Sequence, residues 1–130
     1  MATAKILIVD DEEKFCAYLA KALQKEGFAT STAHNPSQAL EAIHNEKPDL
    51  VTLDMMMPGD SQMPGANGLG VLVQTRKSDK LLPIILISAA ELAEDKDSFL
   101  AMGANAVHHK PIDLAALLAT IRRLLTANGK

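Results

Sequence analysis

Five short strand-like segments recur along the chain, and a helix-like segment follows each of them. The strand-like segments are rich in aliphatic and β-branched residues and cover residues 5–9, 28–33, 50–53, 83–87 and 105–109. After each one, apolar residues return every three or four positions, the spacing that places them on one face of a helix. Strands that alternate with helices form a parallel sheet with right-handed crossovers and helices on both faces. The pattern therefore predicts one open-sheet α/β domain over residues 1–130.

The predicted helices have recognisable ends. Gly27 follows the first helix as a stop signal, Asn35 and Pro36 form a cap and first-turn proline for the second, and Asp113 caps the last. The other two helices are expected over residues 68–77 and 92–103. The last helix should bury a leucine-rich face, formed by Leu114, Leu117, Leu118, Ile121, Leu124 and Leu125.

Polar residues follow four of the predicted strands. The first strand is followed by Asp10 and Asp11, the third by Asp54, the fourth by Ser88 and the fifth by Lys110. In open α/β sheets, ligands bind outside the carboxyl ends of the strands, where these side chains should converge. We therefore expect one functional site at this edge of the sheet.

The residue types at this edge favour phosphoryl chemistry. Three carboxylates in one pocket repel one another, and Mg²⁺ suits such an oxygen-rich site while leaving positions for a phosphate oxygen. Lys110 and the Ser88 hydroxyl can bind phosphoryl oxygens. A central carboxylate can attack phosphorus and form an acyl phosphate, and Asp54 is the best candidate for that nucleophile.

Four sequence motifs together resemble the receiver domains of two-component response regulators. They are ILIVDDE, DMMMP with a later GLGVL, PIILISA and GANAVHHKP, and the resemblance covers essentially the whole chain. It implies a flavodoxin-like (CheY-like) fold: a doubly wound, five-stranded parallel (βα)5 sheet with strand order 2-1-3-4-5. It also implies a cis peptide bond between Lys110 and Pro111.

The resemblance assigns a role to each site residue. Asp10, Asp11 and Asp54 would hold Mg²⁺ together with the backbone carbonyl of Met56, Asp54 would accept the phosphoryl group, and Ser88 and Lys110 would bind its oxygens. The donor would be a sensor histidine kinase or a histidine phosphotransfer protein. The output would be altered binding of an unidentified target or effector domain, with the last two helices and the strand between them as the docking face. Such a domain is not an enzyme beyond its own phosphorylation and dephosphorylation.

Composition restricts the alternatives. Only 3% of the residues are aromatic and the net charge is −3, so we expect neither base stacking nor direct nucleic-acid binding. The single cysteine, Cys16, excludes an internal disulfide and should be a small buried residue. We find no segment of membrane-spanning length and no signal-peptide pattern, so we expect a cytoplasmic location and no membrane insertion.

The chain departs from the family pattern at three places. The loop after Asp54 carries about six extra residues and repeats the sequence MPG; it is either a tolerated surface insertion or a lid that places Asp60 near the metal or the kinase-facing surface. Val107 stands where relatives often have an aromatic residue, so either the switch is muted or another element of that face reports the phosphate. Met56 and Ala90 are apolar where some relatives carry water-orienting side chains, which suggests a long-lived phosphoryl group.

The four histidines are expected to have minor roles. His108 and His109 should point to opposite faces of a strand and so cannot chelate one ion together. His34 and His44 look exposed, with no partner nearby in sequence.

Two other functions compete with the phosphoacceptor interpretation. A phosphatase of the haloacid dehalogenase type would need a second acid two residues after the nucleophile, where this chain has Met56. A pseudo-receiver would be an interaction module that is never phosphorylated; Val107 is compatible with it, but the complete set of acids, hydroxyl and lysine opposes it.

Overall fold

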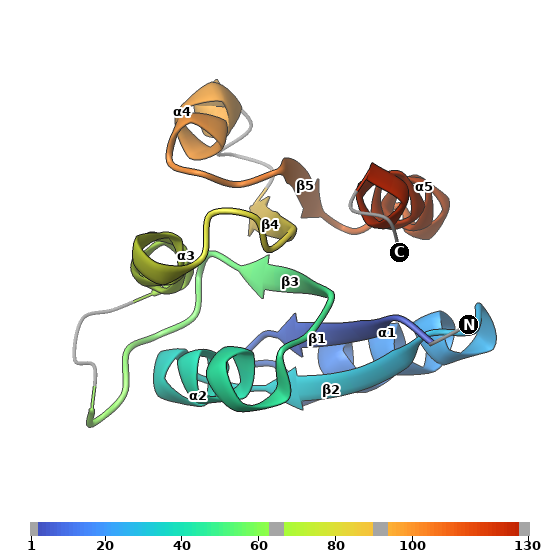
Figure 1. The fold of residues 1–130 in the computed structure, drawn as a ribbon, viewed down its shortest axis with the longest axis horizontal. Coiled ribbons are helices and arrows are strands. Elements are labelled where there is room, and N and C mark those ends of the chain that lie inside the picture. The colour runs from blue at the N-terminus through green and yellow to red at the C-terminus, as the bar shows by residue number, and fades with distance from the viewer. Residues whose placement is uncertain (1–2, 63–66, 90–93, 128–130) are drawn as a thin grey trace.

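The computed structural model describes residues 3–62, 67–89 and 94–127. Five parallel strands form one sheet in the order β2-β1-β3-β4-β5, as the resemblance implies (Figure 1). The strands are β1 (Lys5–Val9), β2 (Ala29–Ala33), β3 (Leu50–Asp54), β4 (Ile84–Ala89) and β5 (Ala106–Lys110). All four pairings between neighbouring strands are parallel, so the carboxyl ends of the five strands lie at one edge.

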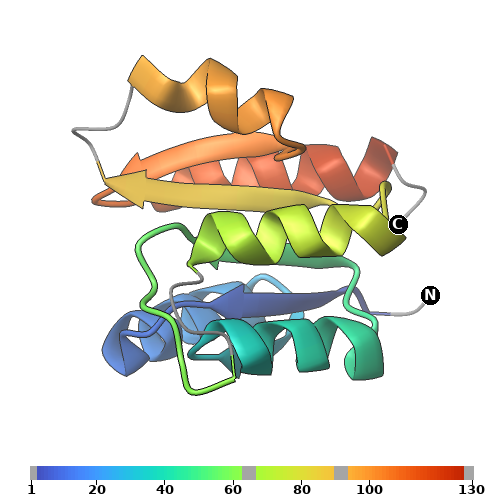
Figure 2. The same cartoon turned by 90° about the vertical axis from the view of Figure 1, so that its left-hand side faces the viewer.

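Helices cover both faces of the sheet. They are α1 (Glu13–Lys25), α2 (Pro36–Glu46), α3 (Gly68–Ser78), α4 (Lys96–Ala101) and α5 (Leu114–Ala127). Helices α2, α3 and α4 lie on one face, and α1 and α5 lie on the other (Figures 1 and 2). This is the three-layer α/β architecture that the alternating pattern predicts.

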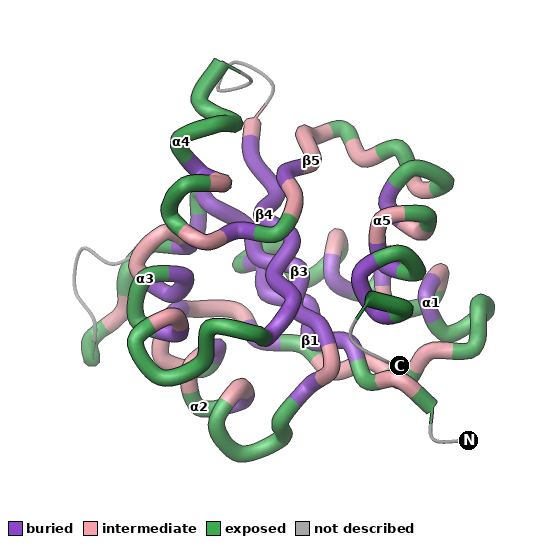
Figure 3. The backbone as a smooth tube through the Cα atoms, turned by 45° about the horizontal axis from the view of Figure 1, so that its top comes forward, coloured by how far each residue is buried: buried purple, intermediate pink, exposed green. Residues whose placement is uncertain are grey.

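The core consists of two aliphatic layers, one on each side of the sheet. Successive residues of β1 alternate between them: Leu7 and Val9 pack toward α2, α3 and α4, whereas Ile6 and Ile8 pack toward α1 and α5. The central strands β1, β3 and β4 are buried almost throughout, whereas the edge strands β2 and β5 are only partly buried and the helices expose their outer sides (Figure 3). Burial on both faces explains why the central strands are continuously apolar in sequence.

The predicted helix ends are largely confirmed. The side chain of Asn35 accepts a hydrogen bond of 2.8 Å from the Gln38 amide, and that of Asp113 accepts one of 3.1 Å from the Ala116 amide. Gly27 adopts φ +94°, a left-handed conformation that favours glycine. The peptide bond between Lys110 and Pro111 is cis, as expected.

Several predicted boundaries were displaced by one or two residues. β3 includes Asp54, β4 runs two residues further than expected, and β2 and β5 each begin one residue later. The described part of the fourth helix begins at Lys96, and the predicted start at Leu92 lies outside the described residues. In the described ranges, no helix combines the length and hydropathy needed to cross a membrane.

Candidate functional site

The carboxyl ends of β1, β3, β4 and β5 border one cavity of about 590 Å³. Three of the predicted site acids line it together with Lys110 and Met56; the complete described lining is Asp10, Asp11, Glu12, Asp54, Met56, Ala89, Lys110 and Pro111. The structure therefore brings together five of the six residues selected from the sequence. Ser88 is the sixth, and it is not among the described residues that line the cavity.

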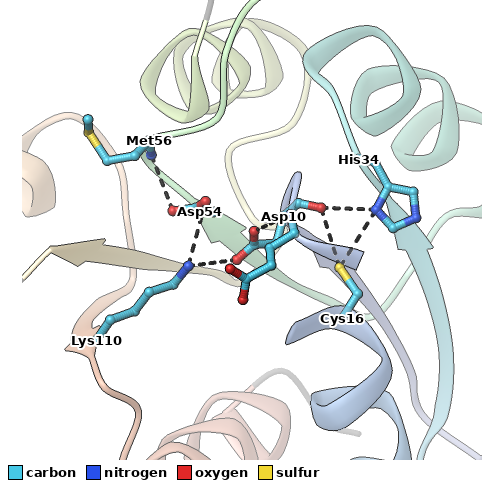
Figure 4. Close-up of polar contacts among 7 residues, drawn as sticks. Asp10, Cys16, His34, Asp54, Met56 and Lys110 are labelled. Carbon is cyan, nitrogen blue, oxygen red and sulfur yellow. Dashed lines mark hydrogen bonds and ion pairs between the residues drawn. The ribbon is translucent and has the colours of Figure 1, made fainter. Parts of the chain in front are cut away.

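Lys110 reaches between the two buried carboxylates (Figure 4). Its Nζ lies 2.9 Å from Oδ2 of Asp10 and 3.8 Å from Oδ2 of Asp54. The remaining oxygens accept backbone hydrogen bonds: Oδ1 of Asp10 from the Glu12 amide at 2.8 Å, and Oδ1 of Asp54 from the Met56 amide at 3.2 Å. Each buried carboxylate is thus held by one backbone amide and one shared ammonium group.

The shared lysine only partly offsets the cost of burying these acids. Burial raises the pKa of Asp54 from its ordinary value of 3.8 to about 6, the negative charge of Asp10 adds to this, and Lys110 and the Met56 amide oppose it. Burial alone would lower the pKa of Lys110, but its hydrogen bond to Asp10 and the charge of Asp54 raise it overall. Near pH 7 the site therefore contains an ionised Asp54 and a protonated Lys110.

The donor set fits a hard divalent cation. One carboxylate oxygen each from Asp10, Asp11 and Asp54 lies within 4.8 Å of the others, and Asp11 is exposed while the other two are buried. Met56 lines the same cavity, although its side chain extends into solvent. Oxygen-only ligands with open positions suit Mg²⁺ better than a thiophilic metal.

Gly68, the first residue of α3, allows that helix to approach the backbone of Asp54. Its amide donates a 3.1 Å hydrogen bond to the carbonyl of Met55. A Cβ atom at this position would overlap the carbonyl oxygen of Asp54 and would lie 2.7 Å from Cα of Met55. This close approach fixes the end of β3 against α3.

The fifth strand directs its two histidines to opposite faces, as predicted. Nε2 of His108 lies 2.9 Å from Oγ1 of Thr120 in α5, and Nδ1 of His109 lies 2.9 Å from Oγ of Ser88 in β4. The two rings therefore have different partners on different sides of the sheet. Val107 is buried in the layer beneath α2, α3 and α4.

The described part of the inserted loop is anchored to α2. Oδ2 of Asp60 accepts a 3.0 Å hydrogen bond from the Ser37 amide, and Oδ1 accepts a 2.8 Å bond from the Ser37 hydroxyl. Asp60 is not among the described residues that line the cavity, so these contacts favour a tethered surface loop over a lid that brings Asp60 to the acids. The second MPG copy and Ala90 lie outside the described residues.

Two contacts at the site were not foreseen from the sequence. The prediction that His34 is exposed was wrong: the residue is half-buried, and its Nδ1 lies 3.0 Å from the carbonyl oxygen of Asp10 and 3.8 Å from Sγ of Cys16 (Figure 4). The ring of Phe15 lies 4.7 Å from Nζ of Lys110, a cation–π distance. His44 is exposed and Cys16 is buried, both as predicted, and burial together with the charge of Asp10 raises the pKa of Cys16 to about 11.

The model of the family described as "Response regulator receiver domain" matches residues 6–122 of the chain. The chain belongs to this receiver family. A curated relative, an uncharacterized transcriptional regulatory protein named YkoG from Bacillus subtilis, is 40% identical over 129 residues, which are 99% of this chain and 54% of that protein. The receiver thus spans about half the length of this relative.

Two further comparisons agree with the assignment. The alkaline phosphatase synthesis transcriptional regulatory protein PhoP of Bacillus subtilis is 33% identical over 93% of this receiver and 48% of its own length. The crystal structure of the receiver domain of NtrX from Brucella abortus matches with a TM-score of 0.84 and 33% identity, over 93% of this chain and 98% of that one. The fold and the family are therefore supported by sequence and by structure.

Proposed function

We propose that this receiver accepts a phosphoryl group on Asp54 from a sensor histidine kinase or a histidine phosphotransfer protein, with Mg²⁺ as cofactor. The observation that carries the proposal is the position of Asp54, a buried carboxylate that opens into a cavity beside Lys110 and two further acids. A carboxylate oxygen of Asp54 would attack phosphorus, the bond from phosphorus to the donor nitrogen would break, and an acyl phosphate would remain.

The neighbouring residues would bind the metal and the phosphoryl oxygens. Asp10, Asp11, Asp54 and the backbone carbonyl of Met56 would hold Mg²⁺, which when bound neutralises charge on the phosphoryl oxygens. Lys110 is 2.9 Å from Asp10 and 3.8 Å from Asp54, so a modest movement would bring its ammonium group to a phosphoryl oxygen. The Ser88 hydroxyl would donate to another oxygen after turning toward the cavity.

The proposed output is a change in partner binding by a single domain that covers residues 1–130. The relatives are named as transcriptional regulators, and the receiver corresponds to about half of their length, so control of an effector domain or of a separate target protein is consistent with them. We place the docking face on α4, β5 and α5, and the domain in the cytoplasm. No described feature favours the pseudo-receiver alternative, because the acids and the lysine form one connected site.

The test is intact mass after incubation with acetyl phosphate, with and without Mg²⁺. The unmodified receiver and the control Asp97→Asn, which changes an exposed acid on α4, should gain one Mg²⁺-dependent phosphoryl adduct. Asp54→Asn should gain none. An adduct that persists in Asp54→Asn would refute the assignment of the acceptor, and no adduct on any variant would refute the phosphoacceptor function.

A further inference from the structure

The hydroxyl of Ser88 is hydrogen-bonded away from the cavity in which it is expected to act. Its Oγ lies 2.9 Å from Nδ1 of His109 and 3.4 Å from the carbonyl oxygen of Ala89. Ser88 is 1% exposed, and among the described residues the cavity is lined by Ala89 rather than by Ser88. We therefore expect the hydroxyl to leave its contact with His109 when it reaches a group on Asp54.

The register of β4 against β5 places Ser88 and His109 next to each other. β4 and β5 run side by side (Figure 2). In their register, Ser88 lies directly opposite His109. Alternation along β5 places His109 on the same face as Val107, which packs in the layer beneath α2, α3 and α4. Paired residues on one face of neighbouring strands are close enough for direct side-chain contact. The imidazole of His109 is also partly exposed, so a change in its position would be visible at the surface.

A serine hydroxyl has one hydrogen to donate. In the tautomer of His109 whose Nδ1 accepts that hydrogen, this nitrogen, the carbonyl of Ala89 and a phosphoryl oxygen compete for it. An anionic phosphoryl oxygen is the stronger acceptor, because hydrogen bonds to charged groups are about twice as strong as neutral ones. Phosphorylation would therefore remove the hydroxyl from His109 and leave the imidazole to find a new partner or a new tautomer.

We propose that His109 is a positioning residue that holds Ser88 in the phosphate-free receiver and changes partner when Asp54 is phosphorylated. The inference rests on the proposed function of Asp54 and adds a residue to it. The Ser88 hydroxyl would then couple phosphorylation of Asp54 to the position of His109 on the α4 and β5 face. This coupling needs no aromatic residue at position 107. By reciprocity, any interaction that moves the imidazole also changes the affinity of the site for the phosphoryl group.

His108 provides a matched internal control. It is the neighbouring residue, its ring also contacts a hydroxyl at 2.9 Å, and its partner Thr120 lies in α5 on the opposite face. A general tightening of β5 would affect both rings, whereas release by Ser88 would affect only His109.

The first experiment is NMR of the imidazole nitrogens by long-range proton–nitrogen correlation, at constant pH with Mg²⁺, before and after addition of beryllofluoride, a stable analogue of the phosphoryl group. We expect the Nδ1 signal of His109 to shift while both signals of His108 stay in place. If the Met56 amide shifts in an Asp54-dependent way and His109 does not respond, the inference is wrong but the proposed function stands. If no Asp54-dependent shift occurs at all, both are refuted.

The second experiment measures the beryllofluoride concentration at half saturation, from the Met56 amide, in four variants. His109→Leu should bind about fivefold more tightly, the size of one ordinary hydrogen bond, because Ser88 is no longer held. In a Ser88→Ala background the same substitution should change binding by less than about twofold, since the coupling depends on the hydroxyl. His108→Leu should also change it little. Weaker binding by His109→Leu, or an equal effect with and without the Ser88 hydroxyl, would overturn the inference.

Discussion

Replacing Asp54 by Asn should stabilise the metal-free receiver. Asp54 is 5% exposed, and burial with the nearby charge of Asp10 raises its pKa from 3.8 to about 6. At about 1.4 kcal/mol per pH unit, this shift corresponds to about 3 kcal/mol of unfavourable free energy for the ionised group. Because the cavity is open to solvent, which screens the charge, we expect a gain of about 1–3 kcal/mol in the free energy of unfolding.

The pH dependence gives the sign of this effect. The pKa of Asp54 is higher in the folded state, so the folded receiver binds the proton more tightly, and the contribution of this group to stability falls as pH rises from about 3.8 to about 6. Asn resembles the neutral carboxyl group at every pH. The advantage of Asp54→Asn should therefore be complete above about pH 7 and mostly gone near pH 4.

The assay is urea denaturation in the presence of a chelator, at about pH 8, pH 6 and pH 4, with Asp97→Asn as the exposed control. Adding Mg²⁺ should stabilise the unmodified receiver and reduce its difference from Asp54→Asn, because a cation that binds only the folded state stabilises it. A variant less stable than the unmodified protein at pH 8, or a gain that does not change with pH, would refute the electrostatic reasoning.

Three further substitutions test the site and the loop anchored beside it. Gly68→Ala should lower the free energy of unfolding by about 2 kcal/mol and slow phosphorylation from acetyl phosphate, because the Cβ of the alanine would push against the backbone of Asp54. Urea titration measures the first effect and intact mass the second. Lys110→Met should lower stability by about 1–2 kcal/mol and raise the pKa of Asp54, which NMR titration would show. Ser37→Ala should lower the free energy of unfolding by about 1 kcal/mol, because it removes one hydrogen bond to Asp60, and should leave the extent of phosphorylation unchanged. Urea titration and intact mass check these two outcomes.

The fold was predictable because its signals are local. The three central strands, β1, β3 and β4, are largely apolar runs, and the caps at Asn35, Asp113 and Gly27 depend on residues within a few positions of each helix end. Boundaries such as the end of β4 were displaced. The length of a strand depends on how far it pairs with a neighbouring strand, and the sequence does not state which residues pair. The order of the strands came from the family resemblance.

The site was predictable to the extent that strand ends determine it. Asp54 and Lys110 end parallel strands and Asp10 directly follows one, so topology alone brings them together. The contact of His34 with the Asp10 carbonyl depends on the register of β1 against β2, which the sequence does not state. The contact of the Ser88 hydroxyl with His109 of β5 depends on which residues pair across β4 and β5, so it was not foreseen, and the role of Ser88 stays a prediction.

The charge count at the cavity connects the stability prediction with the proposed function. Four acids, Asp10, Asp11, Glu12 and Asp54, and one lysine, Lys110, line the cavity, so its formal charge is −3. Burial is the main reason that the pKa of Asp54 is raised, and repulsion by Asp10 adds to it. A second lysine would relieve that repulsion, but it would also reduce the excess charge that attracts a divalent cation. The repulsive part of the pKa rise at Asp54 and the proposed affinity for Mg²⁺ therefore arise from the same uncompensated charge. Substitutions that stabilise the metal-free receiver at this cavity should for that reason weaken its response to Mg²⁺.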